Sequence, residues 1–344
     1  MCRSVYFILV IWFHALVFNE SIFAIDTNLS FMRMDNSTGL NSNTVYCAFQ
    51  DSNGQMWFGT KEGLASYDTY TFKTWRIDSK NPYSIGNNGV YSICEDRDNR
   101  LWIGTESGLY LFNKDSEVFL QINGLGIEKS HIRSIAEDSY GNIWVASLGH
   151  GIFKYNPKDK EVRNYRQSQN VGLNSDYSTK ILSDSLGNVW CLASGSYLHR
   201  YNRDSDTFEK ILIKDEKKGM VEKNAFTMCL DWKGDLWIGG WDCGIFHYSL
   251  DESCFENYLT DSGRPILYGR IHTIKAFEPN MIYIGSDHGL TLFNPSLRKH
   301  TTYFYIQDNS RSLSDDFVYD ILKDNEGGLW VTTYFGGINF STQL

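Results

Sequence analysis

The sequence predicts an all-β protein built from seven similar sheets, and three observations support this prediction. First, the segment Leu101–Phe112, LWIGTESGLYLF, recurs with variations at seven places along the 344-residue chain. Second, subtracting the position of each copy's large aromatic residue from the next gives spacings of 45, 42, 46, 47, 46 and 47 residues. Third, aromatic residues make up 15% of the chain, and such side chains favour the pleated surface of strands. A period of this length is typical of a seven-bladed β-propeller. The aromatic residues are Trp57, Trp102, Trp144, Trp190, Trp237, Tyr283 and Trp330.

The N-terminus has the features of a secretory signal peptide, predicted to occupy residues 1–24. Arg3 supplies a positive charge, Val5–Phe18 an apolar core of 14 residues, and Ala24 a small residue for cleavage. A membrane anchor is the alternative, but 14 residues are few for crossing the hydrocarbon layer. We therefore expect residues 25–344 to form an exported, periplasmic propeller that does not span the membrane after signal removal.

Composition argues against several classes of partner and site. The formal net charge of −9 is unsuited to nucleic acid or an anionic membrane face. The six cysteines after the signal make no CxxC pair, and four of them fall in predicted strands, which favours buried free thiols. Their even number leaves disulfides as the alternative. No zinc ligand set accompanies them, so we expect neither a metal nor a cofactor. The six are Cys47, Cys94, Cys191, Cys229, Cys243 and Cys254.

Each repeat is predicted to form four antiparallel strands, named a to d in chain order. Strand a is an apolar run such as Val90–Cys94, followed by an Asp–Gly turn such as Asp51–Gly54. The aspartate bonds its own turn and the glycine takes a positive φ; the alternating ligands of a calcium loop are missing. Strand b carries the large aromatic residue. Strand c follows a second glycine, as in Leu109–Phe112, and strand d ends the repeat. We expect the aromatic residues to fill the gap between neighbouring sheets.

The last repeat leaves no room for its strand d. In complete repeats this strand begins 15 to 18 residues after the aromatic residue, which from Trp330 falls beyond Leu344. Leu29–Met34 has the pattern of a strand d. We therefore predict that this N-terminal strand pairs into the last blade and closes the ring, leaving no open sheet edges at the seam.

One face of the ring is the candidate binding face. With strand a innermost, the d–a and b–c connections share this face, and sequence variation among the repeats is concentrated there. Sugar rings stack on aromatic side chains while planar polar groups fix their hydroxyls, so a glycan is the expected ligand, nearer blades four to seven. The alternatives are that the recurring Asn and Asp residues cap turns and that Trp241 and Tyr334 cover a protein partner. The candidate ligand-binding residues are Tyr197, Trp241, Asp242, Arg270, His272, Asp287, His288, Tyr334 and Phe335.

The repeat, written as D-x-x-G-x-[LI]-W-[IV]-G-T-x-x-G-L-x-x-[FY], resembles the two-component-regulator propeller repeat. Asp96–Phe112 and Asp51–Tyr67 fit best, although Asn99 replaces the turn glycine in the former. Blade six departs most, with Tyr283 in place of tryptophan. The resemblance covers about residues 29–344. It implies the periplasmic sensor region of a hybrid two-component system of Bacteroides-type bacteria, with other sensor domains or a sensor kinase as partners.

Two further functions stay open. An enzyme, either a hydrolase or a lyase acting on polysaccharide, would draw acid–base groups from the mouth of the ring. The candidates lie in separate repeats, and no catalytic signature or kinase motif is present. A purely structural interaction ring is the other alternative. The acid–base candidates are Glu62, Glu106, His150, His272 and His288.

Overall fold

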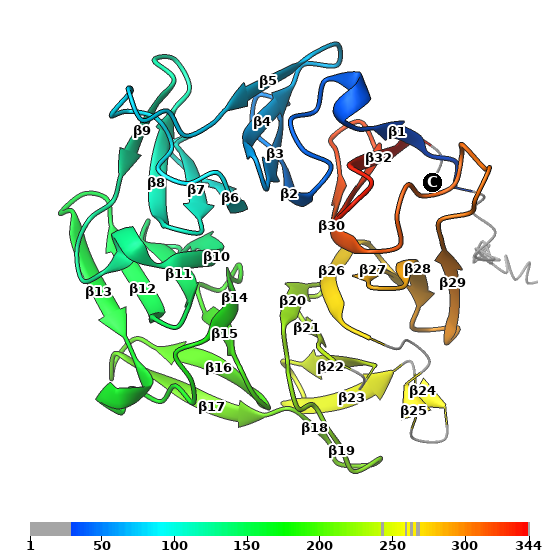
Figure 1. The fold of residues 1–344 in the computed structure, drawn as a ribbon. Helices are drawn as coiled ribbons and strands as arrows, with labels where there is room; N and C mark the ends of the chain where they lie inside the picture. Colours follow the sequence, from blue (N-terminus) through cyan, green and yellow to red (C-terminus); the bar gives the residue numbers. More distant parts are fainter. Residues whose placement is uncertain (1–28, 242–243, 259, 262–263, 266–268, 343–344) are drawn as a thin grey trace, which may run out of the picture.

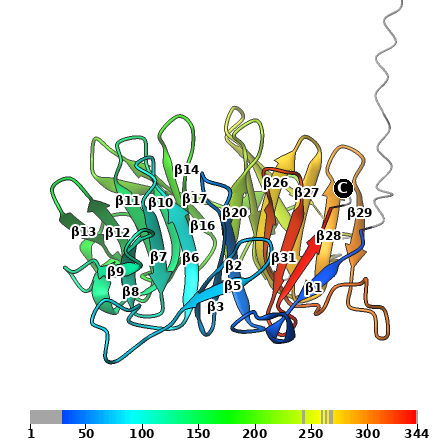
Figure 2. The same cartoon turned by 90° about the horizontal axis from the view of Figure 1, so that it is seen from above.

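The seven-bladed propeller predicted from the repeat spacing is confirmed by a computed structural model. The structure describes residues 29–241, 244–258, 260–261, 264–265 and 269–342. Seven four-stranded antiparallel sheets stand around a central axis, each with the predicted strand a innermost (Figure 1). Seen from the side, the ring is a short cylinder with loops on both faces (Figure 2). The predicted signal peptide, residues 1–24, lies outside the described residues.

The blades follow one another in chain order, and the bounds of their strands are as follows. Blade one contains β2 (Val45–Gln50), β3 (Met56–Thr60), β4 (Gly63–Tyr67) and β5 (Phe72–Trp75). Blade two contains β6 (Val90–Glu95), β7 (Leu101–Thr105), β8 (Gly108–Asn113) and β9 (Val118–Gln121). Blade three contains β10 (His131–Glu137), β11 (Ile143–Leu148), β12 (Gly151–Asn156) and β13 (Glu161–Tyr165). Blade four contains β14 (Ser178–Ser183), β15 (Val189–Ala193), β16 (Tyr197–Asn202) and β17 (Thr207–Leu212).

The remaining blades have the same order. Blade five contains β20 (Thr227–Leu230), β21 (Leu236–Gly239), β22 (Ile245–Ser249) and β23 (Cys254–Tyr258). Blade six contains β26 (Ile271–Glu278), β27 (Met281–Ser286), β28 (Gly289–Asn294) and β29 (Lys299–Tyr303). Blade seven contains β30 (Val318–Lys323), β31 (Leu329–Thr333), β32 (Ile338–Ser341) and, as its outermost strand, β1 (Met32–Met34).

Two short hairpins and three 3₁₀ helices complete the described part, and the repeat pattern did not predict them. The hairpins pair β18 (Lys214–Asp215) with β19 (Met220–Val221) and β24 (Thr260–Asp261) with β25 (Arg264–Pro265). The 3₁₀ helices are η1 (Asn36–Thr38), η2 (Ile127–Lys129) and η3 (Gln167–Gln169). Within the described residues, no helix is long and apolar enough to cross a membrane.

The large aromatic residues fill the gaps between neighbouring blades, as predicted. Trp144 of blade three is fully buried and packs edge-on against Tyr201 and Phe208 of blade four. Trp330 of blade seven packs at a tilt beside Phe58 of blade one, so the packing runs across the seam. Because each blade supplies one such wedge, the core is divided into seven clusters rather than gathered in one centre.

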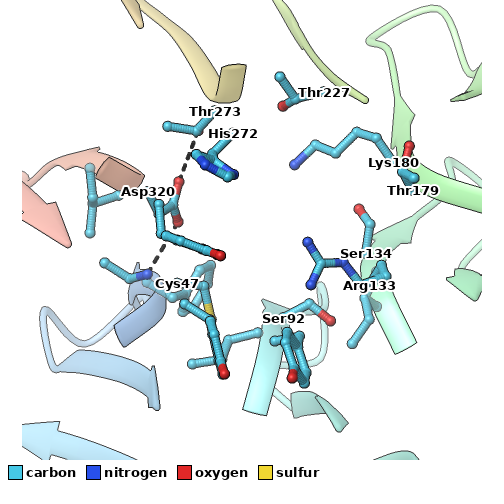
Figure 3. Close-up of a pocket in the computed structure, with 18 of the residues that line it drawn as sticks. Cys47, Ser92, Arg133, Ser134, Thr179, Lys180, Thr227, His272, Thr273 and Asp320 are labelled. Carbon is cyan, nitrogen blue, oxygen red and sulfur yellow. Dashed lines mark hydrogen bonds between the residues drawn. The ribbon is translucent and has the colours of Figure 1, made fainter. Parts of the chain in front are cut away.

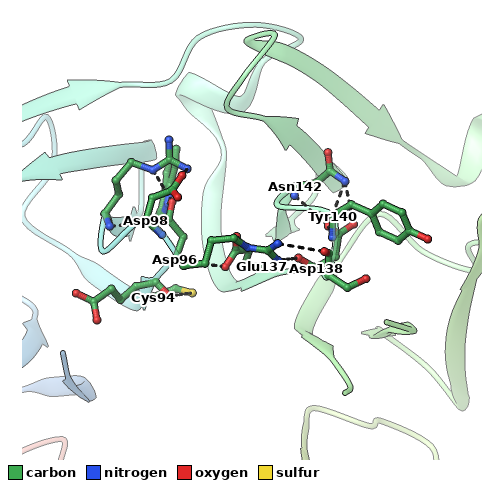
Figure 4. A network of polar contacts seen from close by, with 12 residues as sticks. Cys94, Asp96, Asp98, Glu137, Asp138, Tyr140 and Asn142 are labelled. Carbon is green, nitrogen blue, oxygen red and sulfur yellow. Dashed lines mark hydrogen bonds and ion pairs between the residues drawn. The ribbon is translucent and has the colours of Figure 1, made fainter. Parts of the chain in front are cut away.

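The Asp–Gly turns are confirmed as structural turns on one face. Asp138 accepts backbone hydrogen bonds from Tyr140 at 2.9 Å and Asn142 at 3.0 Å, and Gly141 has a φ of +82° (Figure 4). Arg97, in the preceding blade's turn, donates to Glu137 Oε1 at 2.6 Å and thereby ties blade two to blade three. These carboxylates accept hydrogen bonds from the turns themselves and from the neighbouring blade, which fits a structural role for this face.

The predicted closure of the ring is also confirmed. β1 pairs with β32 in antiparallel register, with Met32 opposite Phe340 and Met34 opposite Ile338. The strand is shorter than Leu29–Met34 because the Phe31 amide instead bonds the Arg311 carbonyl at 2.9 Å. Phe31 is nevertheless buried between blades six and seven, so the N-terminal segment closes both the sheet and the core.

The described cysteines are free thiols, as the sequence favoured. Cys191 is a buried residue, Cys47, Cys94 and Cys229 are partly buried residues, and Cys254 is exposed. Burial raises the pKa of the Cys47 and Cys229 thiols to about 12, so both are protonated and unreactive near neutral pH. Cys243 lies outside the described residues.

Candidate functional site

One residue at or near the start of each innermost strand points into the central channel. In six blades the a–b ladder is interrupted by a register shift at this residue, as between Val45 and Cys47 or between Val318 and Asp320. A β-bulge of this kind frees one residue from the ladder and re-aims its side chain. The residues at this position line a cavity of about 210 Å³ on the ring axis. They are Tyr46, Tyr91, Arg133, Thr179, Phe226, His272 and Tyr319.

Aromatic rings form a continuous arc around part of this cavity. Tyr46 stacks on Tyr91 with ring centroids 4.3 Å apart and lies 5.7 Å from Tyr319. Tyr319 in turn stacks on His272 at 4.4 Å and on Tyr334 at 5.4 Å. The arc therefore runs from blade two through blades one and seven to blade six. Because the rings stack on one another, they form a rigid aromatic wall with phenol hydroxyl groups on one side of the cavity.

A histidine–carboxylate pair stands at the blade-six end of the arc. His272 Nε2 and Asp287 Oδ1 share a 2.5 Å hydrogen bond, and Asp287 Oδ2 accepts the Arg270 amide at 3.2 Å. Burial lowers the pKa of His272, although Asp287 acts in the opposite direction. The imidazole is therefore neutral near pH 7, and its orientation is fixed by the carboxylate.

Arg270 places a guanidinium group between two aromatic rings at the rim. Its Cζ lies 3.6 Å from the centroid of Phe226 and 5.7 Å from that of Trp241. The buried Nε has no hydrogen-bond partner among the described residues. Burial, followed by the charge of Arg133, lowers the pKa of Arg270, yet an arginine remains charged at neutral pH. One donor of this group is thus left for a ligand.

Charged side chains lie deeper in the channel (Figure 3). Asp320 accepts hydrogen bonds from Thr273 Oγ1 at 3.1 Å and from the Ala48 amide at 3.2 Å, and it pairs with Lys275 Nζ at 3.0 Å. Arg133 and Lys180 project into the same cavity from blades three and four. The channel therefore carries more positive than negative groups, although the chain as a whole has a net charge of −9.

The structure brings together part of the predicted site. Arg270, His272, Asp287 and Tyr334 meet at the mouth, with Trp241 and Phe335 at its rim, where they are 49% and 64% exposed.

Two predicted residues do not join this group, and a third cannot be placed. Tyr197 begins β16, pairs with Leu212 and faces Lys210, so it does not line the cavity. His288 is exposed beside Gly269. Asp242 lies outside the described residues. The composition of the loops favoured blades four to seven, whereas the aromatic arc extends to blades one and two.

Sequence reasoning missed Arg133, Lys180, Phe226 and Tyr319. A signal for three of them was present, because Arg133, Phe226 and Tyr319 align with Tyr46 and Tyr91 when the repeats are superimposed. In the sequence this position fits the usual alternation of a strand, and the residue pattern does not reveal the β-bulge that turns its side chain into the channel. Lys180 occupies the following position in blade four.

One cluster in the described part of the chain has the composition of a metal site. Asp231, Asp235 and His247 place their ligand atoms close together on the Asp–Gly face. However, His247 sits opposite Trp237, at the position that Lys154 and Arg200 occupy opposite the tryptophans of blades three and four. His247 is therefore the local version of a recurring side chain that covers the tryptophan ring, and we assign no metal there.

Comparison with known proteins agrees with the repeat pattern. The family model for the two component regulator propeller matches residues 39–62, 84–107, 126–149 and 312–335, in blades one, two, three and seven. The chain therefore carries two-component regulator propeller repeats, as the sequence resemblance implied. No curated protein matches the chain.

Several solved structures share the fold. Extracellular domains of two hybrid two-component systems from B. thetaiotaomicron are 21% and 20% identical, each with a TM-score of 0.76 over 91% of this chain. The chain spans only 40% and 42% of their lengths. Virginiamycin B lyase from Staphylococcus aureus is 15% identical, with a TM-score of 0.68 over 91% of this chain and 98% of that chain. At these identities the likeness establishes the propeller fold and nothing finer.

Proposed function

We propose that this chain, built from two-component regulator propeller repeats, is the extracytoplasmic ligand-binding propeller of a two-component signalling system, and that its ligand is a glycan fragment. The arc of Tyr46, Tyr91, Tyr319 and Tyr334 is the observation that carries the proposal. A rigid wall of tyrosine rings with hydroxyl groups suits a sugar, which has both C–H groups and hydroxyl groups, and the adjoining Asp287 accepts hydrogen bonds from hydroxyl groups.

The size of the site agrees with a small ligand. A cavity of about 210 Å³ is below the usual range for drug-sized ligands. We therefore place one sugar ring in the channel and the rest of the fragment over the rim, against Trp241 and Phe335. Export through the predicted signal peptide and a signalling partner, either another sensor domain or a sensor kinase, belong to the same proposal.

Calorimetric titration of the purified protein with a panel of neutral and acidic oligosaccharides tests this function. Tyr319→Ala removes the ring at the centre of the arc and is expected to weaken binding at least tenfold. Tyr70→Ala is the matched control, because Tyr70 is 88% exposed and takes no part in the arc. Absence of binding to every oligosaccharide, or equal binding by the Tyr319 variant and the wild type, would overturn the proposal.

An enzyme is the second candidate, favoured by the His272–Asp287 pair. A neutral imidazole held by a carboxylate is the arrangement of a general base with its orienting partner. A structure of virginiamycin B lyase with quinupristin, 14% identical with a TM-score of 0.67 over 91% of this chain and 98% of that chain, is described as a catalytically inactive histidine-to-alanine variant. Incubating this protein with polysaccharides and following new reducing ends and unsaturated products tests the idea. Turnover that His272→Ala abolishes would support an enzyme; bound glycan without turnover would exclude this candidate.

A further inference from the structure

Two cations in the central channel have no anionic partner among the described residues. Arg133 projects from β10 and lies over two aromatic rings, with Cζ 5.0 Å from the centroid of Tyr91 and 5.5 Å from that of Phe226. Lys180 projects from β14 into the same cavity and has neither a hydrogen bond nor an ion pair to a described residue (Figure 3). Lys275, on the opposite side, shows the contrast, since Asp320 neutralises it.

Such an arrangement is costly for the unliganded protein. A cation removed from bulk water is destabilising unless a carboxylate or several acceptors surround it. Burial lowers the pKa of both Arg133 and Lys180, and the charge of Lys275 lowers that of Lys180 further, although Asp320 acts in the opposite direction. Arg133 reaches neighbouring blades through cation–π contacts, but within the described residues neither charge forms an ion pair with a carboxylate. An anionic group from outside would supply the absent partner.

Two hydroxyl groups in the same sector of the channel are also unused. Ser92 and Thr179 line the cavity beside the two cations, and their Oγ atoms have no hydrogen-bond partner among the described residues. Unsatisfied buried polar atoms are uncommon in folded proteins and call for a water molecule, an ion or a ligand. The sector formed by blades two, three and four therefore offers two charges and two hydroxyl groups.

We infer that Arg133 and Lys180 bind the acidic substituent of the ligand, so that the propeller selects a sugar carrying a carboxylate or a sulfate ester over a neutral one. This inference rests on the proposed glycan-binding function. The guanidinium fork suits two oxygens of one carboxylate or sulfate, and the ammonium group adds a point charge. Because Arg133 lies against Tyr91, the acidic group and the stacked sugar ring belong to one molecule.

The test compares matched probes with matched variants. The full chain is titrated calorimetrically with a glucuronate-containing disaccharide, a sulfated disaccharide, a neutral disaccharide of the same linkage, and sodium sulfate alone. A charge-assisted hydrogen bond is worth about 1.5–3 kcal/mol, which corresponds to roughly 10- to 150-fold in affinity. We expect Arg133→Met and Lys180→Met each to weaken the preferred acidic sugar within that range and the neutral sugar less than about twofold.

The control is Lys233→Met, which removes an exposed lysine on the Asp–Gly face and should change neither affinity. If Arg133→Met does not fold, Arg133→Lys keeps the charge but loses the fork, and it should still weaken the acidic sugar. Equal affinity of the wild type for acidic and neutral sugars, or unchanged binding by the folded variants, would overturn the inference.

The outcomes also separate this inference from the proposed function. If the protein binds neutral and acidic sugars with equal affinity, and Tyr319→Ala binds neither, the acidic subsite is rejected while the glycan function stands. If sulfate binding depends on Arg133 and no sugar binds more tightly than sulfate alone, the glycan function is rejected and only an anion site remains.

Discussion

Tyr283 donates a 2.6 Å hydrogen bond from its hydroxyl to Glu278 Oε1, and this pair replaces in blade six the tryptophan–aspartate pair of the other six blades. In those blades the indole Nε1 donates to the turn aspartate over 2.7–3.1 Å. In blade six a glutamate replaces the aspartate and a tyrosine hydroxyl replaces the indole N–H, so the hydrogen bond between the aromatic residue and the turn is preserved. The link joins the inter-blade wedge to the turn on the Asp–Gly face, so core packing and turn geometry support each other.

The wedges are expected to be the largest single contributors to stability. Truncating a fully buried aromatic side chain costs about 3–5 kcal/mol, so Trp102→Ala and Trp144→Ala should each lower the free energy of unfolding by that amount. Chemical denaturation monitored by circular dichroism measures it. A loss below about 1 kcal/mol in either variant would contradict the packing role that the structure gives these residues.

The hydrogen bond between wedge and turn can be tested separately from the wedge itself. Asp138→Ala leaves the Trp144 indole and two backbone amides without their acceptor, at about 1–3 kcal/mol for a buried unsatisfied group. The variant should bind any ligand with unchanged affinity, because Asp138 lies on the face opposite the mouth. A variant of normal stability with impaired binding would show that scaffold and site have been assigned to the wrong faces.

The N-terminal strand should be essential for the closed ring. Arg33 donates to the carbonyl groups of Asn309, Ser312 and Leu313 at 2.8–3.1 Å, and Phe31 is buried. Deleting residues 25–35 would expose the edge of β32 and the apolar surface beneath Phe31. We expect a markedly lower melting temperature and, in gel filtration, association through the open edge. Melting unchanged from that of the full chain would count against closure by this strand.

Acid sensitivity follows from a buried histidine in blade four. His199 is fully buried, and this burial lowers its pKa to about 4, against 6.5 for an unperturbed imidazole. Between these values the unfolded chain binds a proton that the folded chain does not, so stability falls as the pH drops from about 6.5 to about 4. The maximum slope is about 1.4 kcal/mol per pH unit for one group.

Replacing that histidine isolates its contribution from those of other acids and bases. The His199→Leu variant should lose roughly 3 kcal/mol less than the wild type between pH 7 and pH 4. Denaturant unfolding of both proteins across this range gives the difference directly. Parallel pH profiles would show that His199 titrates normally in the folded chain.

Much of the fold could be predicted from sequence because each blade repeats the same pattern of turn and core residues. The Asp–Gly turn, the aromatic wedge and the second glycine recur at fixed offsets, and the missing last strand pointed to Leu29–Met34. The hairpins β18–β19 and β24–β25 could not be predicted, because each occurs once and lies outside the repeat.

The candidate site was less accessible to sequence reasoning. The loop residues Arg270, Asp287 and Tyr334 stood out because they differ from blade to blade. Arg133 and Lys180 did not, because their exposure to the channel depends on bulges and on the approach of seven strands to one axis. Tyr197 shows the opposite error. Its loop position varies from blade to blade and was therefore predicted to bind ligand, but its side chain faces Lys210 and does not line the cavity.

The position of a bound glycan tests the central claim most directly. A crystal structure of the protein soaked with the oligosaccharide that binds most tightly in calorimetry would locate it. We predict a sugar ring in the channel against Tyr46 and Tyr319, with any acidic group within hydrogen-bond distance of Arg133. Ligand density confined to the Asp–Gly face, or lying on the outside of the ring away from these residues, would contradict the claim.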